Sequence, residues 1–160
     1  MSRQSRLWSA IAAAGFLATT LGAAAFAADE PANIIKYRQA FMKANGAHIT
    51  MLAAVVKGEV SWTDELEDHA EALHEQSEYL LRLFPEGSGK DDTDAKSAAL
   101  PVIWEKWSEF EQAANRFQEE SGKLVEAVES GDQAAIGQQL GVLGKQGCGN
   151  CHETFREEQD

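Results

Sequence analysis

The chain has 160 residues, of which 26 are acidic and 14 basic, so its formal net charge is −12 at pH 7. This length is typical of one domain with a single hydrophobic core. Nucleic acids and anionic membrane surfaces attract basic patches, so the acidic balance argues against both as partners. Any partner that docks by charge is expected to be basic.

The first 27 residues have the order of a secretory signal peptide. Two arginines lie among the first six residues, residues 7–21 are mostly apolar or small, and Ala25-Phe26-Ala27 supplies a small-residue cleavage site. The apolar run is shorter than the ~20 residues that a membrane helix needs. We therefore expect export, with cleavage after Ala27. The mature chain, residues 28–160, then lacks the two arginines and has a net charge of −14.

The rest of the chain has the pattern of amphipathic helices. Apolar residues recur every three or four positions, and no stretch alternates with period two. Four such runs are present, and they cover residues 34–56, 66–84, 101–128 and 136–151. Turn-forming residues separate the runs: Lys57-Gly58, Pro85 with the polar segment 86–94, and Ser130-Gly131-Asp132.

Four helices with mostly short connections predict an all-α fold, an antiparallel four-helix bundle with up-down-up-down topology. Pro101 is a good residue for the first turn of the third helix, because its missing N–H has no partner there. Asp132 is expected to cap the fourth helix. No internal repeat is evident, so residues 28–160 are expected to form one domain.

The only two cysteines, Cys148 and Cys151, are three residues apart and are followed directly by His152. On a helix this spacing brings both thiols to one side, where they can add across the two vinyl groups of one porphyrin. The adjacent imidazole is then placed to coordinate the iron. The motif therefore predicts one covalently bound haem c, with His152 as an axial ligand.

Three other roles of a Cys-x-x-Cys pair fit less well. A thioredoxin-like pair follows a strand, and this sequence has no strand pattern. A structural zinc site needs about four ligands, and only His48, His69 and His74 remain. A disulfide across so short a loop stabilises little, even in an exported protein. His69 and His74 stand among acidic residues and are expected to be solvated, and His48 is a weak candidate for a haem ligand.

The haem motif lies near the C-terminus, on the last predicted helix, and other short motifs accompany it: Lys36-Tyr37-Arg38-Gln39, Val56-Lys57-Gly58-Glu59, Pro101-Val102-Ile103-Trp104, Gly131-Asp132 and Phe155-Arg156. On these residues the chain resembles the cytochrome c prime family, the class II c-type cytochromes, over residues 33–156. The resemblance implies a haem within a four-helix bundle and, with the signal peptide, a periplasmic location.

The resemblance also implies roles for two residues of the first helix. In the family, a side chain of this helix lies over the haem face opposite the motif histidine, and the corresponding residue here is Met42. In low-spin members a methionine at this position binds the iron, and the sequence around Met42 is closest to that branch. In five-coordinate members an apolar side chain leaves the sixth site empty. Arg38, four residues earlier, is by resemblance near a haem propionate.

The function expected from these residues is single-electron transfer, with His152 and Met42 as the two iron ligands and no enzymatic activity. The alternative is a five-coordinate haem protein that binds small gases such as NO or CO at an open sixth site. Methionine also fills gaps in helical cores, so its presence does not decide between the two. The redox partner is not specified, no membrane insertion of the mature chain is expected, and a homodimer is left open.

Overall fold

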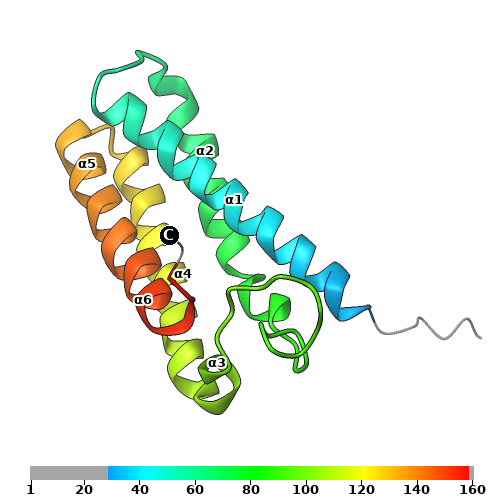
Figure 1. Ribbon diagram of the computed structural model, residues 1–160. Coiled ribbons are helices and arrows are strands. Elements are labelled where there is room, and N and C mark those ends of the chain that lie inside the picture. Colours follow the sequence, from blue (N-terminus) through cyan, green and yellow to red (C-terminus); the bar gives the residue numbers. More distant parts are fainter. Residues whose placement is uncertain (1–28, 159–160) are drawn as a thin grey trace, which may run out of the picture.

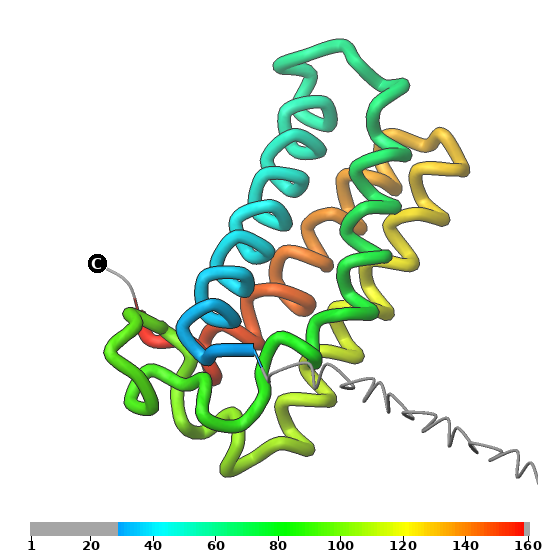
Figure 2. The backbone as a smooth tube through the Cα atoms, turned by 90° about the vertical axis from the view of Figure 1, so that its right-hand side faces the viewer, coloured from blue at the N-terminus to red at the C-terminus, as the bar shows by residue number. Residues whose placement is uncertain are grey.

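The computed structural model of the protein describes residues 29–158. Four helical rods lie side by side (Figures 1 and 2): α1 (Pro31–Val56), α2 (Leu66–Ser77), α4 (Trp107–Glu129), and a last rod in which α5 (Gln133–Val142), a π-helical segment (Leu143–Gly149) and α6 (Asn150–Phe155) follow without a break. The predicted antiparallel four-helix bundle is confirmed. The predicted signal peptide lies outside the described residues, so cleavage after Ala27 stays a prediction.

The helix ends follow the expected local chemistry. Pro31 opens α1 at its first turn. Gly131 ends the turn after α4 with a φ of 71°, a left-handed conformation that glycine adopts without steric cost. The Asp132 carboxylate then accepts hydrogen bonds from the backbone N–H groups of Ala134 (2.9 Å) and Ala135 (3.2 Å), so the predicted cap of α5 is confirmed.

Three of the predicted runs are interrupted. After α2 the chain continues as a 3-10 turn (Leu80–Leu83), and a short helix, α3 (Val102–Glu105), is separated from α4 at Lys106, whose φ and ψ of −126° and 46° are not helical. The third interruption is the π-helical segment. Apolar spacing reports only which side of a run faces the core, so it cannot reveal a change of helix type within a run. None of the helices within residues 29–158 is long and apolar enough to cross a lipid bilayer.

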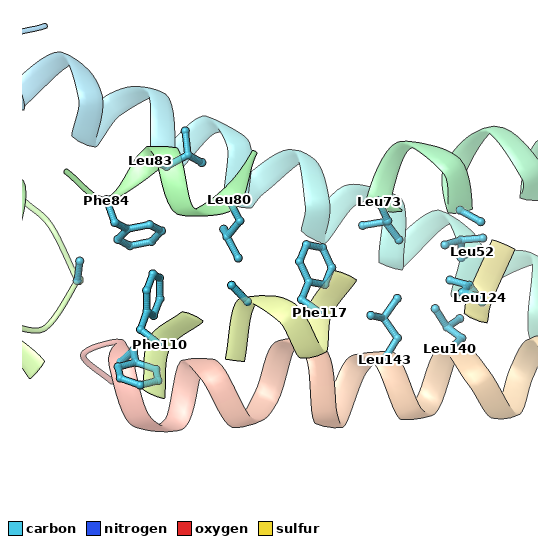
Figure 3. Packing of buried hydrophobic residues seen from close by; sticks show 14 of the residues in the cluster. Leu52, Leu73, Leu80, Leu83, Phe84, Phe110, Phe117, Leu124, Leu140 and Leu143 are labelled. Carbon is cyan, nitrogen blue, oxygen red and sulfur yellow. The ribbon is translucent and has the colours of Figure 1, made fainter. Parts of the chain in front are cut away.

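One hydrophobic core runs through the bundle (Figure 3). Leucines from all four rods fill one end, and they are fully buried: Leu52, Leu73, Leu124 and Leu143. Aromatic rings fill the other end, where Phe110 packs edge-to-face on Phe84 and Phe155 with ring centroids 4.7 and 5.3 Å apart. Phe155 comes three residues after His152, so the aromatic end of the core lies next to the predicted haem motif.

A long loop, residues 84–101, folds over the aromatic end, and Arg38 of α1 anchors it. The Arg38 side chain is 4% exposed. Its two terminal nitrogens donate four hydrogen bonds, to Leu83 O (3.0 Å), Ser88 Oγ (3.1 Å), Ser88 O (2.6 Å) and Ser97 Oγ (2.9 Å). The guanidinium also lies 4.6 Å from the centre of the Phe84 ring. One side chain thus connects α1 to both ends of the loop.

The far end of the loop is fixed to the C-terminal segment. The backbone N–H of Leu100 donates to Phe155 O (3.1 Å), and the N–H of Glu157 donates to Ala98 O (2.8 Å). The loop therefore joins α1, near the position of Met42, to the chain just after His152. Figures 1 and 2 place the first half of α1 and α6 toward this same end of the bundle, which we call the haem end.

We expect Arg38→Leu to lower the free energy of unfolding by at least about 2 kcal/mol, because four charge-assisted hydrogen bonds are lost and their buried acceptors are left unpaired. Arg38→Lys keeps the charge but not the fork of donors, so its free energy of unfolding is expected to lie between that of wild type and that of Arg38→Leu. Denaturant unfolding of the haem-loaded protein measures the loss, and hydrogen exchange of the loop amides locates it.

The neighbouring Gln39 is the matched control, because its exposed amide makes one neutral hydrogen bond to the same loop, to Lys96 O at 2.8 Å. Gln39→Ala is expected to cost less than about 1 kcal/mol. Equal losses in Arg38→Leu and Gln39→Ala would contradict the anchoring role.

Candidate haem site

The structure brings the three residues of the predicted attachment motif together at the end of the last rod. Cys148 lies in the last turn of the π-helical segment, and Cys151 and His152 lie in the first turn of α6. All three side chains are partly buried, and Cys151 packs against the hydrophobic core. No disulfide joins Cys148 and Cys151. A disulfide between them would close only a very small loop and would stabilise little.

Both thiols are held in their neutral form. Burial raises the pKa of Cys148, and burial followed by the charge of Cys148 raises the pKa of Cys151 to about 11. A thiol in apolar surroundings is a poor metal ligand and a slow nucleophile, because both roles require the thiolate. The raised pKa values therefore argue against zinc binding and disulfide exchange by this pair.

The π-helical segment determines where Cys148 lies, and sequence spacing alone did not reveal it. Gly147 packs so closely on α4 that an added Cβ would lie 2.8 Å from Leu143 Cδ1 and 3.3 Å from the Cα of Phe117. Only glycine fits there without displacing backbone. A π turn holds an extra residue and often marks a functional site. Here it widens the helix around Cys148 and ends just before Cys151, in a stretch whose only sequence signal is its density of glycine.

His152 is prepared to act as a ligand by its surroundings. Burial, followed by the positive charge of Arg156, lowers its pKa. The imidazole is therefore neutral at physiological pH and keeps a nitrogen lone pair for coordination. This arrangement fits the predicted axial role of His152.

Met42 and Arg38 lie one turn apart on the same face of α1. The Met42 side chain is partly buried and packs against the core. Arg38 is committed to the loop, but its four acceptors are all uncharged, and none of the ion pairs within residues 29–158 includes it. Burial lowers its pKa to about 10, so it remains a cation at neutral pH. A buried cation without a counter-charge is costly, and a haem propionate would supply one.

The residues present thus fit a covalently bound haem. Cys148 and Cys151 would hold it as thioethers, His152 would provide an axial nitrogen, and Arg38 would lie near a propionate. When bound, the group supplies an iron that can change oxidation state and accept axial ligands. The ligation by Met42 and the propionate contact of Arg38 stay predictions.

Two of the other histidines differ from expectation. His69 and His74 were expected to be solvated, which is wrong, because both are partly buried. His69 packs against His48 of α1, and His74 Nδ1 lies 3.2 Å from Ser121 Oγ on α4. Their acidic sequence neighbours point outward while the histidines themselves face the helix–helix contacts.

The chain is similar to several known proteins over most of its length. The family model described as "Cytochrome C'" matches residues 33–156. Cytochrome c' of Pararhodospirillum photometricum is 39% identical over 127 residues, which cover 79% of this chain and 98% of that protein. Cytochrome c' of Rhodospirillum rubrum is 32% identical over 152 residues, 94% of this chain and 97% of that protein.

A solved structure of similar fold is the nitric oxide complex of a cytochrome c prime variant from Alcaligenes xylosoxidans. It has a TM-score of 0.71 and 26% sequence identity, and the match covers 81% of this chain and 98% of that chain. The family match spans nearly all of the bundle and includes the attachment motif. The chain therefore belongs to the cytochrome c' family, whose members carry one covalently attached haem c in a four-helix bundle.

Proposed function

We propose that this chain is a periplasmic haem protein that binds small uncharged gases, such as NO or CO, on the haem face opposite His152. In this proposal Met42 lies over the open position as an apolar plug and is not an iron ligand. The sequence alone favoured electron transfer with Met42 as an iron ligand, and gas binding was the alternative. The proposal reverses that preference. The observation that carries it is the nitric oxide complex of the related protein, which has the same fold.

The polarity around Met42 supports the same choice. Arg38, one turn away on the same face of α1, uses the N–H groups of both terminal nitrogens on the loop. These donors are therefore not free to hydrogen-bond a polar ligand above the haem. The polarity and donors of the distal side determine which ligands a haem protein prefers, so the lack of a free donor on Arg38 favours ligands that need no hydrogen bond.

The roles of the other residues follow from their surroundings. Cys148, in the π-helical segment, and Cys151, in α6, would hold the haem as thioethers. His152, neutral because of its lowered pKa, would provide a nitrogen ligand to the iron. The loop of residues 84–101 connects the two sides of the site and limits their movement relative to each other.

Electron transfer remains the second candidate, because Met42 is a thioether at this position and methionine opposite histidine is a common ligation in electron carriers. Both candidates are non-enzymatic, and both place the protein in the periplasm through the predicted signal peptide. They differ in whether the Met42 sulfur is bonded to the iron.

Covalent attachment can be measured directly. We expect the mass of protein isolated from the periplasm to equal the mature chain plus one haem, which survives acid–acetone extraction. Cys148→Ser and Cys151→Ser should each keep a single thioether and accumulate less protein, because one bond then holds the group. Purified protein with two free thiols, from cells competent in haem attachment, would rule this out.

The role of Met42 is tested by the absorption spectrum and by gas binding. We expect oxidised wild-type protein to be high-spin at neutral pH and to lack the weak far-red band of a thioether–iron bond. Met42→Leu should keep that spectrum. Met42→Ala should bind CO faster, by about tenfold for each ~1.4 kcal/mol that the plug adds to the barrier.

Met51 is the matched control, because it is the exposed methionine of the same helix, with 40% of its surface accessible. Met51→Leu is expected to change neither the spectrum nor the rate of CO binding. A low-spin wild-type spectrum that becomes high-spin in Met42→Leu, but not in Met51→Leu, would instead establish the electron-carrier ligation.

A further inference from the structure

Two histidines face each other across the contact between α1 and α2, outside the haem site. His48 of α1 and His69 of α2 have their Nδ1 atoms 3.2 Å apart. Their ring centroids are 5.2 Å apart, and the ring planes meet at 61°. Both side chains are partly buried, with 16% of the His69 side chain exposed. The pair has no part in the proposed function.

Two imidazole nitrogens at this distance can share only one proton. One ring donates from Nδ1 and the other accepts with its lone pair. Burial, followed by the charge on His69, lowers the pKa of His48, so the His48 ring is neutral at physiological pH. A lone pair therefore lies between the two rings, in a position that a second electrophile besides the proton could use.

The same contact is short of hydrogen-bond partners. Within residues 29–158, the buried side-chain polar atoms that lack a partner are Asn45 Oδ1 and His69 Nε2. Asn45 is one turn before His48 on the same face of α1. His69 Nε2 lies 3.9 Å from the Glu65 carboxylate, which is too long for a hydrogen bond. Unpaired buried polar atoms are uncommon and call for a structural explanation.

We propose that His48 and His69 bind one divalent transition-metal ion, with Zn²⁺ as the expected occupant, through their two Nδ1 atoms. Zinc–imidazole bonds of about 2.0–2.1 Å in tetrahedral geometry place two ligand nitrogens roughly 3.3 Å apart, close to the separation observed here. Imidazole pairs suit zinc, copper and nickel, whereas Ca²⁺ and Mg²⁺ require oxygen ligands.

Glu65 completes the arrangement from the outside. Once His69 Nδ1 is bound to the metal, its Nε2 carries the proton and can donate to the Glu65 carboxylate after a small side-chain shift. Such carboxylate–histidine–metal arrangements orient the ring and strengthen the ligand. In the described part of the chain no group of three or more His, Cys, Asp or Glu side chains is placed to hold a metal, so the two imidazoles would be the only protein ligands of this ion. Water would complete the coordination.

When both rings carry one proton each, metal binding requires only a change of tautomer. The proton shared between the two Nδ1 atoms moves through solvent to the outer nitrogen of its ring, which frees both Nδ1 lone pairs. No proton is released and no electron is transferred. Zn²⁺ thus replaces the shared proton as the link between α1 and α2.

The experiment uses haem-loaded protein, because Cys148 and Cys151 are then thioethers and cannot compete for zinc. Equilibrium dialysis against ZnCl₂ should give one Zn²⁺ per chain. His48→Gln and His69→Gln should each weaken binding at least tenfold, and Glu65→Gln by about tenfold. His74→Gln is the matched control, since His74 lies on the same helix and is partly buried, and it should bind zinc as wild type does.

Two further measurements keep the outcome independent of folding defects. Zn²⁺ should raise the unfolding midpoint of wild type and of His74→Gln, but not of His48→Gln or His69→Gln. Cu²⁺ bound to wild type should show two nitrogen ligands by electron paramagnetic resonance. The proposal is overturned if wild type binds no zinc, or if a folded His48→Gln, His69→Gln double variant binds it as tightly as wild type.

Discussion

The haem end of this bundle depends on a buried positive charge. Arg38 is removed from water without a carboxylate partner in the described chain, and four uncharged oxygens replace its hydration. Burying a cation is costly unless its donors are satisfied. The acceptors come from the loop of residues 84–101 and the turn before it, so the loop must fold onto α1 for the charge to be buried at all. A propionate beside Arg38 would lower this cost further.

A second constraint acts from the opposite side. Gly147 brings the π-helical segment against Phe117 of α4, and the motif follows at once. The thiols and His152 therefore project from a part of the chain that is fixed by backbone packing. The hydrogen bond from Leu100 N–H to Phe155 O and the bridge between Ala99 and Arg156 connect this part to the same loop that Arg38 holds. The two sides of the site are thus joined by one loop.

Sequence reasoning identified the elements that depend on local pattern. Each of these features depends on residues that are close together in the chain: the apolar spacing of the four runs, the Asp132 cap and the Cys148–His152 motif. The partners of Arg38 lie 45 to 59 residues away in the chain, and His69 lies 21 residues from His48. Such pairings depend on how the helices align, which apolar periodicity does not specify. The π-helical segment could not be predicted for another reason. A glycine-rich helical sequence is compatible with more than one helix type.

The same constraints bear on the role of Met42. A thioether binds iron only if α1 approaches the haem plane closely enough for a bond, so the residue type alone does not determine ligation. Arg38 lies one turn away on the same face, and its hydrogen bonds fix that turn to the loop. The loop is in turn hydrogen-bonded to the segment after His152. The distance between Met42 and His152 is therefore set by contacts of Arg38 and of the loop of residues 84–101, which lie outside the proposed iron ligands.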